Sequence, residues 1–150
     1  MRHARIHVWL AGCMAVLLAP AAWSQAPEAP WVAKTVQGVR FSLAVESILE
    51  PTPSGADPKH ARFLEHRLVV SIRDEATGRA ARIASASADV AEHGYTGATV
   101  PLSPVGSGEE TFYVGRVRLS TKSMHRILVR ATPAGGERTL EAQFEYRHHH

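Results

Sequence analysis

The chain has 150 residues, of which 45% are hydrophobic, and its 17 Lys and Arg against 14 Asp and Glu give a formal net charge of +3 at pH 7. This length fits one domain with a core of its own. The small charge excess excludes a strongly basic nucleic-acid-binding protein, and the single cysteine excludes an intramolecular disulfide.

A secretory signal peptide is predicted over residues 1–24. Two arginines precede an apolar run over residues 8–18, and small residues follow. The run is shorter than the ~20 residues that a membrane-spanning helix needs, and no second run occurs in the sequence. Cleavage is expected after Ser24, because Pro27 would hinder the peptidase at the alternative position, Ala26.

A second interpretation of the same segment is a lipoprotein signal. The letters "LAGC" match a bacterial lipobox that would make Cys13 a lipidated N-terminus, but the apolar run continues well beyond Cys13. Cleavage after Ser24 instead leaves 15 Lys and Arg against 14 Asp and Glu, no cysteine and no transmembrane segment. Arg outnumbers Lys 14 to 3 and Asn is absent, which is typical of a GC-rich bacterial genome, so the predicted location is the periplasm.

The remaining chain is divided into a Pro- and Ala-rich flexible leader over 25–37, a folded domain over 38–148 and a histidine tail at 149–150. Five stretches of the domain alternate apolar and polar residues as half-buried strands do. They read "VRFSLAVES", "FLEHRLVVSIRD", "YVGRVRL", "HRILVRA" and "TLEAQFEYR". "RIASASADVA" is a weaker strand, and residues 92–110, rich in Gly and Pro, hold at most a short one.

No window shows a helical stripe of useful length. Six or seven short strands separated by turns predict an all-β fold, an antiparallel immunoglobulin-like β-sandwich. Half-buried strands require a second sheet to cover their apolar face, which is why two layers are expected.

Most of the domain resembles the FixH/YtkA-like group of bacterial exported immunoglobulin-like domains. "RLVVSIRDEATGRAARIASASADVAEHG", "YVGRVRL" and "HRILVRATPAGGERTLEAQFEY" follow that group's order of strand, turn, small-residue strand and final hairpin. The resemblance implies copper as the bound metal and a periplasmic or membrane-bound copper enzyme as the partner. The group's methionine-rich loop is missing, since only Met124 remains after signal removal.

Enzyme signatures are absent from the sequence. It contains no HExxH, GxSxG, GxGxxG, P-loop or CxxC motif. The prediction is therefore a protein that is not an enzyme, because fold alone does not indicate catalysis.

Three histidines are candidate metal ligands. His66, His125 and His148 share the parity of the apolar residues of their strands, so each is expected to point toward the core near a strand end. Imidazoles at the rim of a sandwich suit copper or zinc, and Met124 would add a soft ligand suited to Cu(I).

Two alternatives remain open at these positions. If "PAGG" closes the last hairpin, His125 lies opposite Phe144 and His148 lies four residues further, about 13 Å away at ~3.3 Å per residue. One ion could then not be shared without a bend in the chain. The favoured alternative for His66 and His125 is a hydrogen-bonded histidine that caps the edge of the core.

The other histidines are expected to be exposed. His60 and His93 fall in loops, and the terminal histidines would bind metals weakly and without selectivity, or are the remnant of a purification tag.

Two functions follow. The leading prediction is a periplasmic metal-binding protein for copper delivery or copper-enzyme assembly. The alternative is an immunoglobulin-like interaction module that binds another envelope protein through a sheet edge or an arginine-bearing face. That face would comprise Arg116, Arg118, Arg126 and Arg130, with Glu141 and Glu145 neutralising it across the hairpin.

Overall fold

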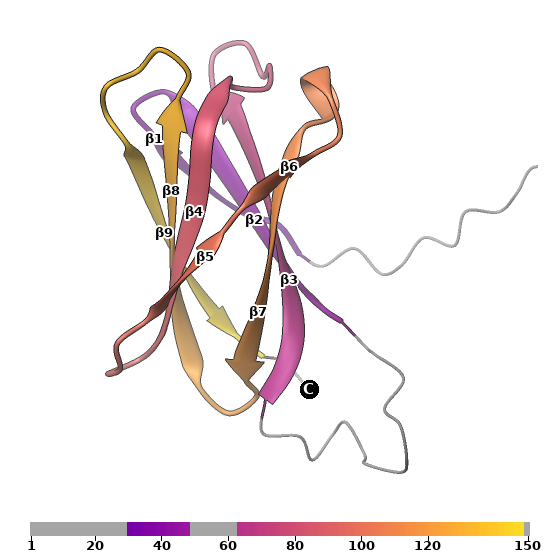
Figure 1. Ribbon diagram of the computed structural model, residues 1–150, viewed down its shortest axis with the longest axis vertical. Coiled ribbons are helices and arrows are strands. Elements are labelled where there is room, and N and C mark those ends of the chain that lie inside the picture. The colour runs from indigo at the N-terminus through magenta and orange to yellow at the C-terminus, as the bar shows by residue number, and fades with distance from the viewer. Residues whose placement is uncertain (1–29, 49–62, 149–150) are drawn as a thin grey trace, which may run out of the picture.

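The computed structural model describes residues 30–48 and 63–148, which form a β-sandwich (Figure 1). The described part contains nine strands and the short 3-10 helix η2 (Gly108–Glu110). The strands are β1 (Val32–Val36), β2 (Val39–Ser47), β3 (Phe63–Asp74), β4 (Ile83–Glu92), β5 (Ala98–Pro101), β6 (Ser103–Val105), β7 (Phe112–Ser120), β8 (Met124–Pro133) and β9 (Leu140–Arg147).

The strands form two antiparallel sheets. The five-stranded sheet has the order β1-β2-β3-β7-β6, and the four-stranded sheet has the order β5-β4-β8-β9. The predicted all-β antiparallel sandwich of immunoglobulin type is confirmed. No helix in the described ranges is long and apolar enough to cross a membrane.

The core lies between the inner faces of the two sheets. Every second residue of the long strands points inward, and the largest fully buried side chains are Phe41 of β2 and Phe144 of β9, at 0% and 1% exposure. Around them pack apolar side chains of β3 and β8, among them Leu68 and Ile127. The alternation of apolar and polar residues along these strands therefore has the expected cause: one face of each strand packs against the core and the other faces water.

The strand number and the leader boundary differ from the prediction. β1 lies within residues 25–37, which were expected to be a flexible leader, and pairs with β2 from Val32 opposite Leu43 to Val36 opposite Val39. Its residues are mostly exposed, so the sequence carries no period-two signal there. Residues 92–110 contain two strands, β5 and β6, where at most one was expected. The predicted signal peptide and Cys13 lie outside the described residues.

β5 and β6 carry the chain from one sheet to the other (Figure 1). Leu102, between them, is buried at 5% exposure. Gly115 of β7 leaves the space for this crossing, because a Cβ there would lie 2.8 Å from side-chain carbons of both Leu102 and Val100.

The register of the β8–β9 hairpin differs from the prediction by two residues. His125 lies opposite Tyr146, and Phe144 lies opposite Ile127. The loop is longer than expected because its turn is closed by the Gly136 N–H donating to the Pro133 carbonyl, 3.0 Å away, with Gly135 at φ +77°. Because of the longer loop, His148 lies two residues, rather than four, beyond the residue that pairs with His125.

Candidate metal-binding histidine pair

His66 lies on β3 at the end of the sandwich where β3 begins and β9 ends (Figure 1). It points inward, as its parity predicts, and is fully buried at 0% exposure. Its neighbours across the five-stranded sheet are Ser47 and Val117. An imidazole therefore stands where the rest of the inner face carries apolar side chains.

The two ring nitrogens of His66 are chemically distinct. Nδ1 lies 2.9 Å from the Leu64 carbonyl oxygen. Since a carbonyl only accepts, Nδ1 carries the proton, and in the neutral ring Nε2 keeps its lone pair. This arrangement, in which one nitrogen donates to a backbone carbonyl and the other is left to bind, is the usual one for a metal-ligating histidine.

The protonation state of His66 also favours ligation. Burial lowers the pKa of its imidazole below the ordinary value of 6.5, and the neighbouring His148 and His125 act in the same direction. The hydrogen bond to Leu64 opposes this effect. The ring is therefore neutral at pH 7, as a metal ligand must be.

His148 follows β9 and supplies the second imidazole. Its Nδ1 lies 3.4 Å from His66 Nε2, and the two ring centroids are 5.5 Å apart at 84°. This nitrogen separation is long for a hydrogen bond, for which about 2.7–3.2 Å is usual. Two nitrogens bound to one ion at about 2.0–2.1 Å in tetrahedral geometry lie about 3.3–3.4 Å apart. The separation within the pair therefore also matches that of two nitrogens bound to one ion.

Tyr146 completes the immediate surroundings of the pair. Its ring meets His66 edge-on with centroids 5.8 Å apart, and its Oη lies 3.4 Å from His148 Nδ1. Burial raises the pKa of the Tyr146 phenol, so the hydroxyl keeps its proton at neutral pH. Tyr146 therefore shields the pair and offers a hydroxyl rather than a phenolate.

His125 caps the core edge, as the favoured alternative predicts. It is 4% exposed, and its Nε2–H donates to the Ser120 carbonyl, 3.0 Å away. This bond ties β8 to the end of β7. The inward orientation predicted for His125 is confirmed, but one of its nitrogens is committed to the backbone.

Met124 does not join the histidines. It neighbours His125 on β8, so its side chain lies on the opposite, outer face of the four-stranded sheet. In the described ranges no group of three or more His, Cys, Asp or Glu side chains is placed to hold a metal ion. The predicted set of His66, His125, His148 and Met124 is therefore not assembled; only His66 and His148 come together.

An apolar groove of about 140 Å³ opens beside the pair and shares Tyr146 with it. Val32 of β1, Leu43 and Val45 of β2 and Phe144 of β9 line it. The sequence indicated that Tyr146 points inward, but the groove was missed because β1 was not predicted. Apolar walls near a site limit solvent access to it.

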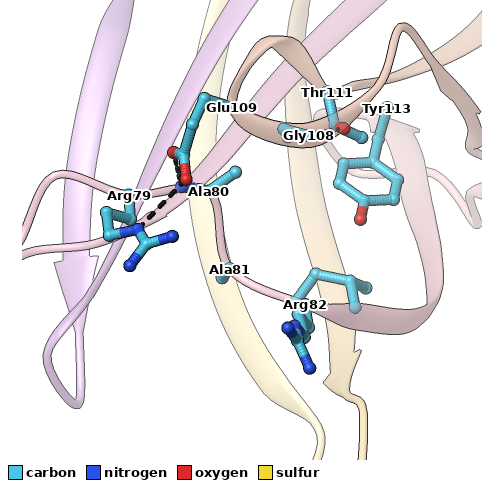
Figure 2. A pocket seen from close by; sticks show the side chains of 9 residues that line it. Arg79, Ala80, Ala81, Arg82, Gly108, Glu109, Thr111 and Tyr113 are labelled. Carbon is cyan, nitrogen blue, oxygen red and sulfur yellow. Dashed lines mark hydrogen bonds and ion pairs between the residues drawn. The ribbon is translucent and has the colours of Figure 1, made fainter.

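A hollow of about 580 Å³ lies at the opposite end of the sandwich. Figure 2 shows the Glu109 carboxylate there, which accepts from the Ala80 N–H at 2.7 Å and from Arg79 Nε at 3.1 Å. The hydrogen bond from Ala80, followed by that from Arg79, lowers the pKa of Glu109. The polar groups of Glu109 and its partners satisfy one another, so Glu109 fastens η2 to the β3–β4 connection.

The predicted arginine face is divided between the two sheets. Arg116 and Arg118 lie on β7, whereas Arg126 and Arg130 lie on β8 of the other sheet. The expected pairing across the hairpin is confirmed for Arg130, whose Nε lies 2.8 Å from Glu141. Among the other histidines, His93 is exposed as predicted, while His60, His149 and His150 lie outside the described residues.

The fold and the pair define a small all-β sandwich domain with two imidazoles at one end. A crystal structure of a DUF4426 family protein from Pseudomonas aeruginosa PAO1 has a similar fold, with a TM-score of 0.52 and 13% sequence identity over 80% of this chain and 97% of that chain. At this identity the likeness shows the fold alone, that of a small β-rich domain. No protein-family model and no curated protein matches the chain.

Proposed function

We propose that this protein is a periplasmic, non-catalytic copper-binding protein in which His66 and His148 hold the ion. The observation that carries the proposal is the 3.4 Å separation of His66 Nε2 and His148 Nδ1, with the other nitrogen of His66 held by Leu64. Such an arrangement fixes the donor atom of the buried ligand before any metal arrives.

The donor set favours copper over zinc. For nitrogen and oxygen ligands, affinity among divalent first-row metals peaks at Cu(II). Two protein ligands also leave coordination positions open for exchangeable ligands, which suits delivery to a partner better than permanent storage. The resemblance to FixH/YtkA-like domains also supports copper as the bound metal. We propose a periplasmic or membrane-bound copper enzyme as the recipient of the ion.

The test is a titration of the protein with Cu(II), Cu(I) and Zn(II). His148→Ala removes one ligand at a half-buried chain end, where the fold is least disturbed. His93→Ala, an exposed turn residue, is the matched control, and the double variant His149→Ala/His150→Ala tests the tail. We expect one tightly bound copper ion in the wild type and both controls, with affinity reduced at least tenfold in His148→Ala.

Two outcomes would contradict the proposal. Copper affinity unchanged in His148→Ala would show that the pair is not the site. Binding lost in the double tail variant but retained in His148→Ala would reduce the metal binding to scavenging by adjacent histidines.

A further inference from the structure

The outer face of the five-stranded sheet carries a partly exposed apolar strip that is separate from the histidine pair. Ala44, Val69 and Val114 lie side by side across β2, β3 and β7, and Val105 lies opposite Phe112. Leu43, Val70 and Tyr113, which adjoin Ala44, Val69 and Val114 in sequence, are buried in the core. Because side chains alternate along a strand, Ala44, Val69 and Val114 point outward. We call the set the Trp31 strip: Trp31, Ala44, Val69, Val105, Phe112 and Val114.

The rings of Trp31 and Phe112 lie over the outer face of the five-stranded sheet. The Trp31 and Phe112 centroids are 6.2 Å apart, although β2 and β3 separate β1 from β7. Three inter-strand steps amount to about 14 Å, so the two side chains must reach toward each other over the sheet. Ala44 beneath them is 1% exposed, while Trp31 and Val105 remain 42% and 54% exposed.

The charges on this face are unbalanced. Its alternating outward positions hold two glutamates, Glu46 and Glu65, against five arginines: Arg40, Arg67, Arg73, Arg116 and Arg118. Glu46 accepts from Arg67 Nε at 2.8 Å, and Glu65 lies 3.2 Å from Arg118 Nε.

The remaining arginines differ in their surroundings. Arg73 donates to the carbonyls of Gly78 and Glu109, at 3.0 and 2.7 Å, and its Nη1 lies 3.9 Å from the Glu109 carboxylate, with which it forms an ion pair. Arg40 and Arg116 form no ion pair with any residue in the described ranges. Arg116 also lies directly opposite Arg67, and like charges in that position destabilise a sheet.

We infer that this face docks an acidic protein surface that places apolar side chains on the Trp31 strip. Tryptophan and arginine dominate the binding energy of protein interfaces, and a carboxylate opposite Arg116 would relieve its repulsion with Arg67. A second copy fits less well, because a symmetric dimer would set two faces with an excess of positive charge against each other. Anionic lipid fits less well, because Glu46 and Glu65 would face the headgroups.

The test is site-specific crosslinking in the native cell envelope. A photoreactive benzoylphenylalanine is placed at Val114 in the strip. As a control it is placed at Leu128, which is also half-buried and lies on the outer face of the four-stranded sheet. We expect an adduct from position 114 only, with a protein that mass spectrometry identifies and whose surface is acidic. Arg116→Glu should reduce the adduct at least fivefold, whereas Arg126→Glu, at an exposed arginine of the other sheet, should not.

A second measurement uses the purified adduct protein. Its affinity for this chain should fall at least tenfold with Arg116→Glu and should weaken as salt increases. Equal adducts from both positions, no protein adduct, an adduct with a second copy, or insensitivity to Arg116→Glu would each overturn the inference. So would binding to phosphatidylglycerol vesicles that accounts for the whole effect of Arg116→Glu.

Discussion

His66 places a titratable ring where the sandwich otherwise buries hydrocarbon. A buried imidazole is stable in the fold only while it is neutral and hydrogen-bonded, which the Leu64 carbonyl and the lowered pKa both provide. The same two features make Nε2 a preformed donor atom. Burial and proposed function therefore have one physical basis at this residue.

The metal-free protein is expected to lose stability on acidification through His66. Because its pKa is lower in the folded chain than its ordinary value of 6.5, the unfolded chain binds more protons once the pH falls below that value. The His66 contribution is constant at higher pH and decreases as the pH falls from 6.5 toward the folded pKa. Urea unfolding midpoints at pH 7.5 and pH 5.0 measure the effect.

His66→Gln is the diagnostic variant, because glutamine can still donate to Leu64 but does not titrate. We expect the loss of stability between the two pH values to be smaller in His66→Gln than in the wild type. In the control His93→Gln, this loss should equal that of the wild type. An equal loss in His66→Gln and the wild type would show that another group causes the acid sensitivity.

At this scale, strand parity could predict which histidines point inward, because alternation is local to each strand. It could not show that His148 meets His66, since 82 positions separate them along the chain. Nor could parity show that the Ser120 carbonyl would occupy His125. Adjacent residues of a strand point to opposite faces, so Met124 and His125 could not share an ion; the sequence interpretation overlooked this constraint.

Among the elements, the β5–β6 crossing depends on a missing side chain. Gly115 faces the core on β7, opposite Leu68, where the rest of the inner face is bulky. The crossing brings Val100 and Leu102 so close that even one methyl group has no room. Glycine is therefore required at position 115 because a side chain would not fit, and not because the backbone needs a conformation that only glycine adopts.

Gly115→Ala is expected to lower the free energy of unfolding by about 1–3 kcal/mol through overpacking. Gly136→Ala, in the β8–β9 loop, is the control, since its nearest neighbours would lie 3.3 Å away and its φ is not positive. Chemical denaturation of the two variants should show the larger loss for Gly115→Ala. An effect no larger than that of Gly136→Ala would contradict the packing explanation.

The elements that sequence reasoning missed share a physical cause. β1, β5 and β6 are short or exposed strands at sheet edges, where pairing with a neighbour rather than burial of an apolar face creates the strand. The predicted register of the β8–β9 hairpin was wrong because the turn conformation sets the register, and a different turn shifts every cross-strand pair by the same number of residues. Long strands with one face in the core were found because burial leaves its period in the sequence.

For the molecule as a whole, β1 sets the domain boundary. Val36 packs against the core, Lys34 Nζ lies 5.9 Å from the centroid of the Phe144 ring, and the strand covers the edge of β2. The folded unit therefore begins before residue 38, the start that the sequence predicted.

A chain that starts at residue 38 should melt at least about 5 °C below a chain that starts at residue 25, consistent with a loss of about 1–2 kcal/mol. Thermal unfolding followed by circular dichroism provides the measurement. The chain that starts at residue 25 also serves as the control, because it lacks only the predicted signal peptide and should melt like the full chain. Equal melting temperatures for starts at 25 and 38 would show that β1 adds no stability.

The sequence by itself determined the long strands, their inner faces and the two-layer architecture, because these depend on an alternation that each segment carries alone. The tertiary structure decided which histidines meet, which face each arginine occupies and where the domain begins. Those outcomes depend on loop conformation, register and sheet order, through which residues far apart in the chain become neighbours.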